Sequence, residues 1–434
     1  MIGRPDRGPP READADARLN SPVTRIPLAP VWSLGTAAPA LLRVISHVPW
    51  VAEEYRTLEH EALVATTVAP FSEAGYTRPI GHLRSFYVER DGARVAYKGT
   101  ELHAADFSDA LRALSQFRSC DPHPPHLTTS LLSLADRFAV MEHKAPGVAL
   151  LTEVMAEATA ATELQLAHLA RHGELARLPV PLHVHRWSDD AAAAYLAAVL
   201  PTVTARSAPI IERLVAGGLG TIAYYYPGAA SRVNAIGFEH PELYRELTHR
   251  ISLPDRLAVL EAGYPLRETI ASWLQLVSRM LALGFFPNDP YGNYLLGECI
   301  QWQNAVLDGG FVDVDSITAM RTIPGERAFT ETFVAMIVEL ATTLRKLLLG
   351  PVQHANLEYK DPSLTTALLV MAVWDGIRRG VEVERAAGGL ADARLGQLIS
   401  EGDTYAFLRR CLTAMHPRPD TGAGPGLVHM TAFL

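Results

Sequence analysis

The segment of residues 284–317 constrains this chain more than any other, because it sets polar side chains at the ends of two apolar runs. The runs at residues 294–296 and 311–314 are typical of short buried strands. The polar side chains around them are Asp289, Asn293, Asp313 and Asp315. Carboxylate and amide oxygens are the ligands that Mg²⁺ prefers, and a further carboxylate can accept a proton. The spacing therefore predicts a bound cation beside a proton acceptor, which is the set of groups that phosphoryl transfer needs.

A lysine at the end of a predicted hairpin is the second feature. Residues 86–89 and 94–97 alternate or run apolar around Asp91-Gly92, a pair that favours a two-residue hairpin turn. The second strand ends at Lys98, and the chain has only four lysines among its 39 Lys and Arg residues. A lysine kept in such a background indicates a point-charge role that a forked guanidinium fills poorly. A solvated hairpin lysine is the alternative interpretation.

Two more elements follow along the chain. Residues 148–171 are rich in Ala, Leu and Glu and are closed by Gly173, which predicts a long helix. Residues 221–228, TIAYYYPG, form an apolar and aromatic run that ends in Pro-Gly, the pattern of a buried strand followed by a turn. Apolar periodicity predicts further helices over residues 265–283, 331–349, 364–379 and 404–415.

In this order the motifs resemble those of the kinase-like superfamily, more its aminoglycoside and choline phosphotransferase branch and the atypical kinases of ubiquinone biosynthesis than the eukaryotic protein kinases. The segments GFFPNDPYGNYLL and GFVDVDS are similar to the family's catalytic loop and metal motif. The resemblance implies that Asn293, Asp313 and Asp315 hold Mg²⁺, and that Asp289 is the catalytic proton acceptor. The family places its catalytic Asp five residues before the Asn, where this chain has Asn288, and the usual loop His is absent.

The resemblance also implies an ATP site at the predicted hairpin and helix. Lys98 would reach the ATP phosphates, and a helix glutamate would pair with it. Glu163 lies where the phosphotransferase branch places this glutamate, with Glu157 and Glu153 as weaker candidates. A solvated helix glutamate is the other open interpretation of Glu163.

Residues 222–228 would be the hinge that joins the two lobes of such a fold and binds the adenine edge. Tyr225 and Tyr226 would then lie near the base. An ordinary buried strand with a turn explains the same letters. No G-x-G-x-x-G is present, which argues against a eukaryotic-type protein kinase.

The expected fold class is α+β, a two-lobed kinase-like fold whose small lobe holds an antiparallel sheet plus a helix and whose large lobe is mainly helical. The expected divisions are a disordered or draped segment over residues 1–30, the small lobe over 31–221 with an insertion near 120–145, the hinge over 222–228 and the large lobe over 229–434.

Composition narrows the class of protein. A chain of 434 residues with 48% hydrophobic and 20% charged residues is ordinary globular material, and its net charge of −8 gives no support for nucleic-acid binding. Three cysteines far apart suit a reducing compartment. No apolar run reaches the roughly 18 residues that span a bilayer. We therefore expect a cytoplasmic protein that binds neither nucleic acid nor membrane.

Histidines offer a competing site. His183 and His185 would lie on one face of a strand, and His123 and His126 could add ligands. No third ligand stands at a telling spacing, and 16 histidines make chance pairs common, so the structural interpretation is favoured over a metal site.

The function that these observations favour is an ATP- and Mg²⁺-dependent phosphotransferase that moves the γ-phosphoryl group to a hydroxyl of a small molecule or natural product. A peptide Ser/Thr kinase of modified-peptide biosynthesis is one alternative. The other is a kinase-like pseudoenzyme that binds nucleotide or a partner protein without catalysis, which the missing His and the shifted Asp289 favour.

Overall fold

The structure, a computed structural model, describes a defined part of the chain. The described residues are 23–65, 76–77, 85–100, 144–145, 147–228, 231–233, 240, 242–243, 245–246, 266–288, 300, 304–353 and 362–400. They form a mixed α and β structure with an antiparallel sheet, so the coarse fold class is confirmed.

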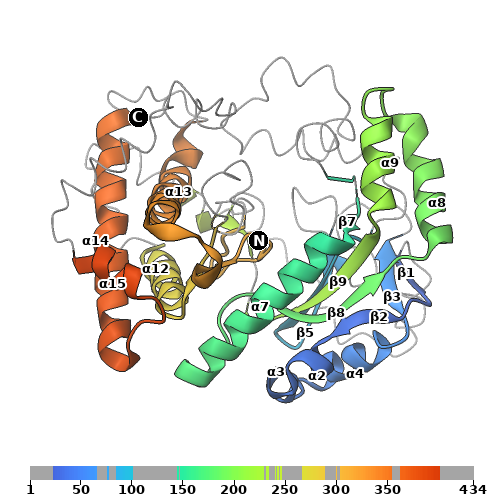
Figure 1. The fold of residues 1–434 in the computed structure, drawn as a ribbon, viewed down its shortest axis with the longest axis horizontal. Coiled ribbons are helices and arrows are strands. Elements are labelled where there is room, and N and C mark those ends of the chain that lie inside the picture. Colours follow the sequence, from blue (N-terminus) through green and yellow to red (C-terminus); the bar gives the residue numbers. More distant parts are fainter. Residues whose placement is uncertain are drawn as a thin grey trace, which may run out of the picture.

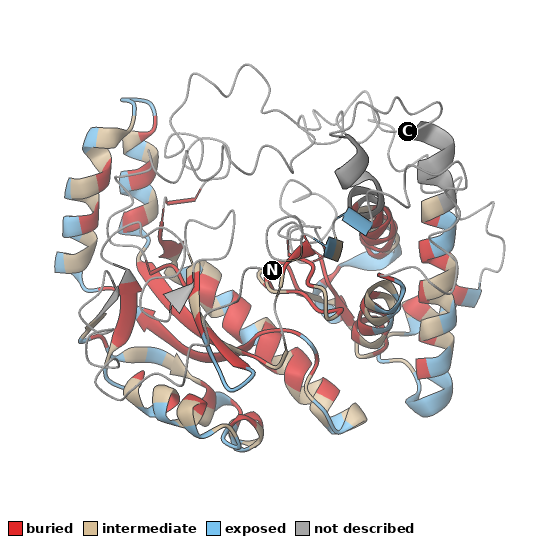
Figure 2. Cartoon of the chain, turned by 180° about the vertical axis from the view of Figure 1, so that it is seen from behind, coloured by how far each residue is buried: buried red, intermediate tan, exposed pale blue. Residues whose placement is uncertain are grey.

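Seven strands form the main sheet, and every pairing in it is antiparallel. Their order is β2 (Pro30–Ser33), β8 (Val180–Arg186), β9 (Leu219–Tyr226), β6 (Ala93–Lys98), β5 (Ser85–Arg90) and β4 (Tyr76–Thr77), and β7 (Ala149–Leu150) also pairs with β9. A separate pair joins β1 (Val23–Ile26) to β3 (Ala62–Ala65). The inner strands of the main sheet are buried along most of their length (Figure 2), because helices cover both of its faces.

The predicted lysine hairpin is confirmed. β5 and β6 pair in a register that places Ser85 opposite Lys98. Asp91 and Gly92 make the turn with φ of 50° and 73°. Positive φ at both central residues gives the turn twist that suits an antiparallel hairpin, and an Asp-Gly pair tolerates it best. The turn therefore fixes the register that brings Lys98 to the end of β6.

Helices cover the two faces of the sheet. One face packs on α7 (Leu151–His172), which ends at Gly173 in the left-handed conformation, as the sequence predicts. The other face packs on α2 (Leu34–Ala37), α3 (Pro39–Ile45) and α4 (Pro49–Thr57). Between β8 and β9 the chain inserts α8 (Asp189–Val199), a 3-10 turn at Leu200–Thr202 and α9 (Ala208–Ala216). Figure 1 shows α8 and α9 side by side at one end of the sheet.

The second half of the chain is mainly helical. Its helices are α12 (Arg267–Ala282), α13 (Gly325–Gln353), α14 (Pro362–Gly388) and α15 (Ala393–Ser400), with a 3-10 turn at Met320–Thr322. The short strands β10 (Phe285–Phe286) and β11 (Thr318–Ala319) pair beside them. In Figure 1, α7 runs from the sheet toward this group of helices. One apolar cluster joins α7 and the sheet to α12, α13 and α14. None of the helices within the described ranges is long and apolar enough to cross a membrane.

Three predicted helices coincide with observed ones: residues 265–283 with α12, 331–349 with α13 and 364–379 with α14. The helix predicted over 404–415 lies outside the described residues.

Two sequence-based expectations differ from the structure. The segment 1–30 was expected to be disordered or draped, and its residues 1–22 lie outside the described residues. Residues 23–26, however, form β1, because Arg25 pairs with Glu54 of α4 at 2.7 Å and the strand bonds to β3. The expected strand over 311–314 is reduced to a single bridge between Phe311 and Ala305. The strand expected over 294–296, and residues 120–143 of the expected insertion, lie outside the described residues.

Candidate functional site

Lys98 lies at the centre of a buried charged cluster built from three distant parts of the chain. Its Nζ is 3.0 Å from Glu157 Oε2, 2.9 Å from Asp313 Oδ1 and 3.6 Å from Asp315 Oδ2. Lys98 is the last residue of β6, Glu157 lies on α7, and the two aspartates follow the bridge at Phe311. The structure thus brings together three of the residues that the sequence selects, Lys98, Asp313 and Asp315.

The backbone around Lys98 is shaped by a glycine. Gly99 has a φ of 74°, which ends the strand immediately after the lysine. A Cβ at this position would lie 2.7 Å from the carbonyl oxygen of Gly220 on β9. Because only glycine accepts both the positive φ and this close approach, Gly99 lets β6 stop where Lys98 faces α7.

Three carboxylates lie close to the Lys98 ammonium. Burial on its own would lower the pKa of Lys98, but Asp313, Glu157 and Asp315 outweigh it and raise the pKa well above the usual value. Lys98 is therefore a permanent cation. Burial raises the pKa of Glu157 to about 7 although Lys98 opposes the shift, and the two aspartates add to it. One ammonium thus faces three carboxylates, and the most deeply buried of them, Glu157, is partly protonated near neutral pH.

The Glu157 carboxylate and the phenol of Tyr224 share a side-chain hydrogen bond, which lowers the pKa of Glu157 and raises that of Tyr224. Glu157 is 1% exposed and Tyr224 is 4% exposed. A hydrogen bond between two buried groups satisfies polar atoms that would be costly to leave unpaired. Lys98, the three carboxylates around it and Tyr224 thus form one buried polar network.

Glu163, the preferred partner of Lys98 in the sequence, does not pair with it. Glu163 lies on the exposed side of α7, where its carboxylate is 2.7 Å from Arg321. Glu157, one of the two weaker candidates, makes the contact with Lys98 instead. The two positions are six residues apart, so a period of 3.6 residues turns them toward different sides of the helix.

A sequence signal for Glu157 did exist. Glu157 lies on the apolar stripe of α7, beside Val154, Ala158 and Ala161, all of which are buried. A glutamate on an apolar stripe is forced toward the core, where it needs a partner.

The tyrosines of β9 divide between the two faces of the sheet. Side chains alternate along a strand, and Ile222 pairs directly with Lys98. Tyr224 therefore lies on the Lys98 side, and the Glu157 carboxylate contributes, after burial, to raising its pKa. Tyr225 packs on the other face, in the cluster formed with α3 and α4. Tyr226 is buried, and its hydroxyl donates to Asp308 Oδ1 at 3.1 Å. The expected place of Tyr225 and Tyr226 near a base stays a prediction; the sequence interpretation missed Tyr224.

The expected catalytic loop is only partly visible. Asp289 and Asn293 lie outside the described residues. Asn288, which occupies the family's catalytic register, is 2% exposed, and its Nδ2 is 3.4 Å from the carbonyl oxygen of Thr332 on α13. Asn288 is therefore turned into the helical core.

The histidine pair of β8 has a structural role. His183 Nε2 contacts the carbonyl oxygen of Tyr55 at 2.9 Å, and His185 Nε2 contacts that of Leu58 at 2.7 Å. Both carbonyls lie at the end of α4, where a helix leaves its last C=O groups without partners. Burial, followed by the neighbouring His185, lowers the pKa of His183 to about 4. The ring contacts agree with the structural interpretation favoured from the sequence.

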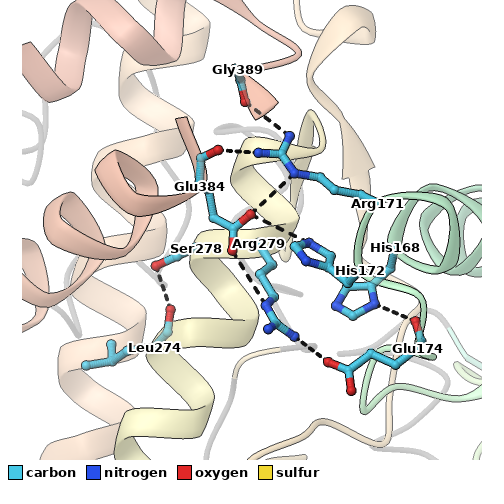
Figure 3. A network of polar contacts seen from close by, with 9 residues as sticks. All are labelled: His168, Arg171, His172, Glu174, Leu274, Ser278, Arg279, Glu384 and Gly389. Atoms are coloured by element: carbon cyan, nitrogen blue, oxygen red, sulfur yellow. Dashed lines mark hydrogen bonds and ion pairs between the residues drawn. The ribbon is translucent and has the colours of Figure 1, made fainter. Parts of the chain in front are cut away.

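The far end of α7 is fixed to the helical half by a charged network (Figure 3). Arg171 donates to the carbonyl oxygens of Gly389 and Glu384, and its Nε is 3.4 Å from Glu384 Oε2. Arg279 of α12 lies 3.6 Å from Glu384 Oε1 and bonds to Glu174 at 2.8 Å. Glu384 of α14 thus joins α7 and α12.

Two histidines of α7 belong to the same network. The rings of His168 and His172 are 4.5 Å apart, and His172 Nε2 lies 3.6 Å from Glu384 Oε2. Burial lowers the pKa of both histidines, so both are neutral at physiological pH. Across the part of the chain that the structure describes, no group of three or more His, Cys, Asp or Glu residues is arranged to hold a metal ion. The contacts of Glu384 with Arg171 and Arg279 hold α7 against α12.

Comparison with protein-family models, with curated proteins and with solved structures finds no match for this chain. Inferences about its function accordingly rest on the geometry of the Lys98 cluster.

Proposed function

We propose that this protein is an ATP- and Mg²⁺-dependent phosphotransferase with a two-lobed, kinase-like fold, which transfers the γ-phosphoryl group to a hydroxyl of a small molecule or natural product. The observation that carries the proposal is the double contact of Lys98, with Glu157 of α7 at 3.0 Å and with Asp313 at 2.9 Å. Kinase-like catalysis requires a strand lysine held by a helix glutamate beside a metal-binding aspartate. A strand, a helix and a later loop supply these groups here in the same chain order.

The residues present suit a magnesium nucleotide in part. Asp313 and Asp315 supply hard carboxylate oxygens two residues apart, and both lie within 3.6 Å of the Lys98 ammonium. The side-chain oxygen of Asn293, the third predicted metal ligand, would add a further contact to the ion. When bound, Mg²⁺ would be held by Asp313 and Asp315 and would offset the charge that develops on the phosphate.

Each residue of the cluster then has a defined task. Lys98 binds phosphate oxygens as a point charge, since its raised pKa keeps it protonated. Glu157 holds the Lys98 side chain in place from α7. Asp289 stays the predicted acceptor of the proton from the substrate hydroxyl. Positioning and charge neutralisation would supply most of the rate enhancement.

Thermal unfolding tests the proposal directly, because a ligand that binds only the folded protein stabilises it, by about 2.7 kcal/mol at a concentration of 100 Kd. We expect ATP with Mg²⁺ to raise the melting temperature above that with Mg²⁺ alone. Asp313→Asn should remove the increment that depends on Mg²⁺, and Lys98→Ala should remove the nucleotide effect altogether. Glu163→Gln is the matched control, since its carboxylate pairs with Arg321 at the surface. A wild-type protein that ATP and Mg²⁺ do not stabilise would refute the proposal.

Nucleotide binding without transfer is the second candidate. The buried Asn288 in the catalytic register favours it, because an amide bonded toward Thr332 accepts no proton from a substrate. Production of ADP by the wild-type protein separates the two candidates: a binding protein forms none, whereas an enzyme forms ADP in a reaction that Asp289→Asn slows. Stimulation of ADP release by peptides, but not by small hydroxylated compounds, would favour the peptide kinase alternative.

A further inference from the structure

Gln165 is a fully buried amide on α7 that binds the loop after the helix. Its Nε2 donates to the carbonyl oxygens of Ala176 at 3.1 Å and Leu178 at 2.8 Å, and its Oε1 accepts from the N–H of Ala176 at 2.9 Å. Three hydrogen bonds to one short loop fix it against the helix, because removing the amide takes a buried partner from the Leu178 oxygen and the Ala176 N–H.

The loop held by Gln165 contacts the segment that leads to Asp313. Arg177 lies between the two residues that Gln165 binds, and its carbonyl oxygen accepts from the N–H of Phe311 at 3.2 Å. The Arg177 side chain also donates to the carbonyl oxygen of Asp308. A Cβ on Gly310 would lie 2.2 Å from the Arg177 oxygen, so the two backbones approach as closely as glycine allows.

These contacts connect two of the three carboxylates of the Lys98 cluster, Glu157 and Asp313, to one helix. Glu157 is carried by α7 directly, eight residues or about 12 Å before Gln165. Asp313 follows Phe311 by two residues, and Phe311 is bound to the loop that Gln165 holds. Gln165 thus links the backbone that precedes Asp313 to the helix that carries Glu157.

We propose that Gln165 is a positioning residue of the phosphotransferase site, which holds the backbone before Asp313 at the place where Asp313 and Glu157 both bind Lys98. This inference rests on the proposed function, because it assigns Gln165 a task in nucleotide binding. It also has a consequence that does not depend on nucleotide: the Lys98 ammonium keeps its contact with Asp313 only while Gln165 keeps its loop.

The test compares two buried side chains that bond to backbone. Gln165→Met keeps the length of the side chain and removes all three hydrogen bonds. His185→Met is the matched control, because it removes one buried contact, to Leu58 on the far face of the sheet. Gly310→Ala acts on the same contact path from its other end, by pushing against the Arg177 oxygen. Gly310→Ala replaces Gln165→Met in both measurements if the Gln165→Met protein does not fold.

The first measurement needs no nucleotide. Lysines are acylated with an activated ester of acetic acid, and mass spectrometry gives the rate at which Lys98 reacts, which depends on its contact with Asp313. The chain has only four lysines, so each is assigned directly. We expect Lys98 to react about tenfold faster in Gln165→Met, relative to the other three lysines, because its ammonium is no longer held against Asp313. In His185→Met the relative rate should equal that of the wild type.

Binding of ATP with Mg²⁺, measured by equilibrium dialysis, gives the second readout. We expect Gln165→Met to weaken the apparent affinity about tenfold, within the range of coupling between residues that share one network. His185→Met should change it less than twofold. If wild-type protein binds no ATP, the proposed function fails and the acylation rates alone decide the role of Gln165. Gln165→Met protein with a lowered melting temperature but unchanged Lys98 reactivity would overturn the inference.

Discussion

Replacing Glu157 by Gln tests how the three carboxylates share the charge of Lys98. Burial raises the pKa of Glu157 from 4.5 to about 7. Between these two pH values the folded protein holds a proton on Glu157 that the unfolded chain has released. By linkage, the free energy of unfolding then falls as the pH rises from 4.5 to 7, by about 3 kcal/mol in total.

Gln carries no charge, so the variant should lack this fall. At pH 4.5 the wild type and Glu157→Gln should have similar free energies of unfolding, and at pH 8 the variant should be the more stable by up to about 3 kcal/mol. Removing one partner of an isolated buried pair costs about 3–5 kcal/mol instead. The sign differs here because Lys98 keeps Asp313 at 2.9 Å and Asp315 at 3.6 Å.

Urea unfolding followed by tryptophan fluorescence at pH 4.5, 6, 7 and 8 measures the effect. Glu163→Gln is the control on the same helix, and its exposed pair should contribute less than about 1 kcal/mol at every pH. The same Glu157→Gln protein should bind ATP with Mg²⁺ more weakly, since Lys98 loses its ion pair with Glu157. A loss of 3 kcal/mol or more at pH 8 would refute the charge balance described for this cluster.

Three further perturbations follow from the structure. His183 has its pKa lowered from 6.5 to about 4, so its contribution to stability is present above pH 6.5 and lost as the pH falls toward 4; in urea titrations, His183→Gln should remove up to about 3 kcal/mol of this dependence. Glu384→Gln should lower the free energy of unfolding by about 1–3 kcal/mol, because two arginines lose their shared carboxylate, whereas Glu382→Gln on the exposed side of α14 should change it by less than about 1 kcal/mol. Gly99→Ala should cost more than about 2 kcal/mol in thermal unfolding and raise Lys98 acylation, because its Cβ meets the Gly220 oxygen at 2.7 Å; unchanged stability would contradict the role given to this glycine.

Local chemistry made several elements predictable. The Asp91-Gly92 pair determines its own turn, so the hairpin and the place of Lys98 at its end follow from neighbouring residues. Gly173 ends α7 for the same kind of reason, since a left-handed residue terminates a helix wherever glycine permits it. The long amphipathic helices are also visible in the sequence, because their apolar spacing requires one buried side.

The ion-pair partners of Lys98 could not be predicted from neighbouring residues in the sequence. Spacing along a helix states which glutamates share a side, but the orientation of α7 on the sheet decides which side meets Lys98. That orientation depends on apolar packing against strands and helices far away in the chain. Glu163 was the wrong choice for this reason, and the contribution of Tyr224 depends in the same way on the pairing of β9 with β6.

The sequence by itself determined the turn, the helices, the apolar strand and the acidic residues near Asp313, because each of these depends on side chains a few positions apart. Only the tertiary structure decided that Glu157 and Asp313, which are 59 and 215 residues from Lys98, meet at its ammonium. The physical reason is that a buried charge is tolerated only among partners that the whole fold brings together.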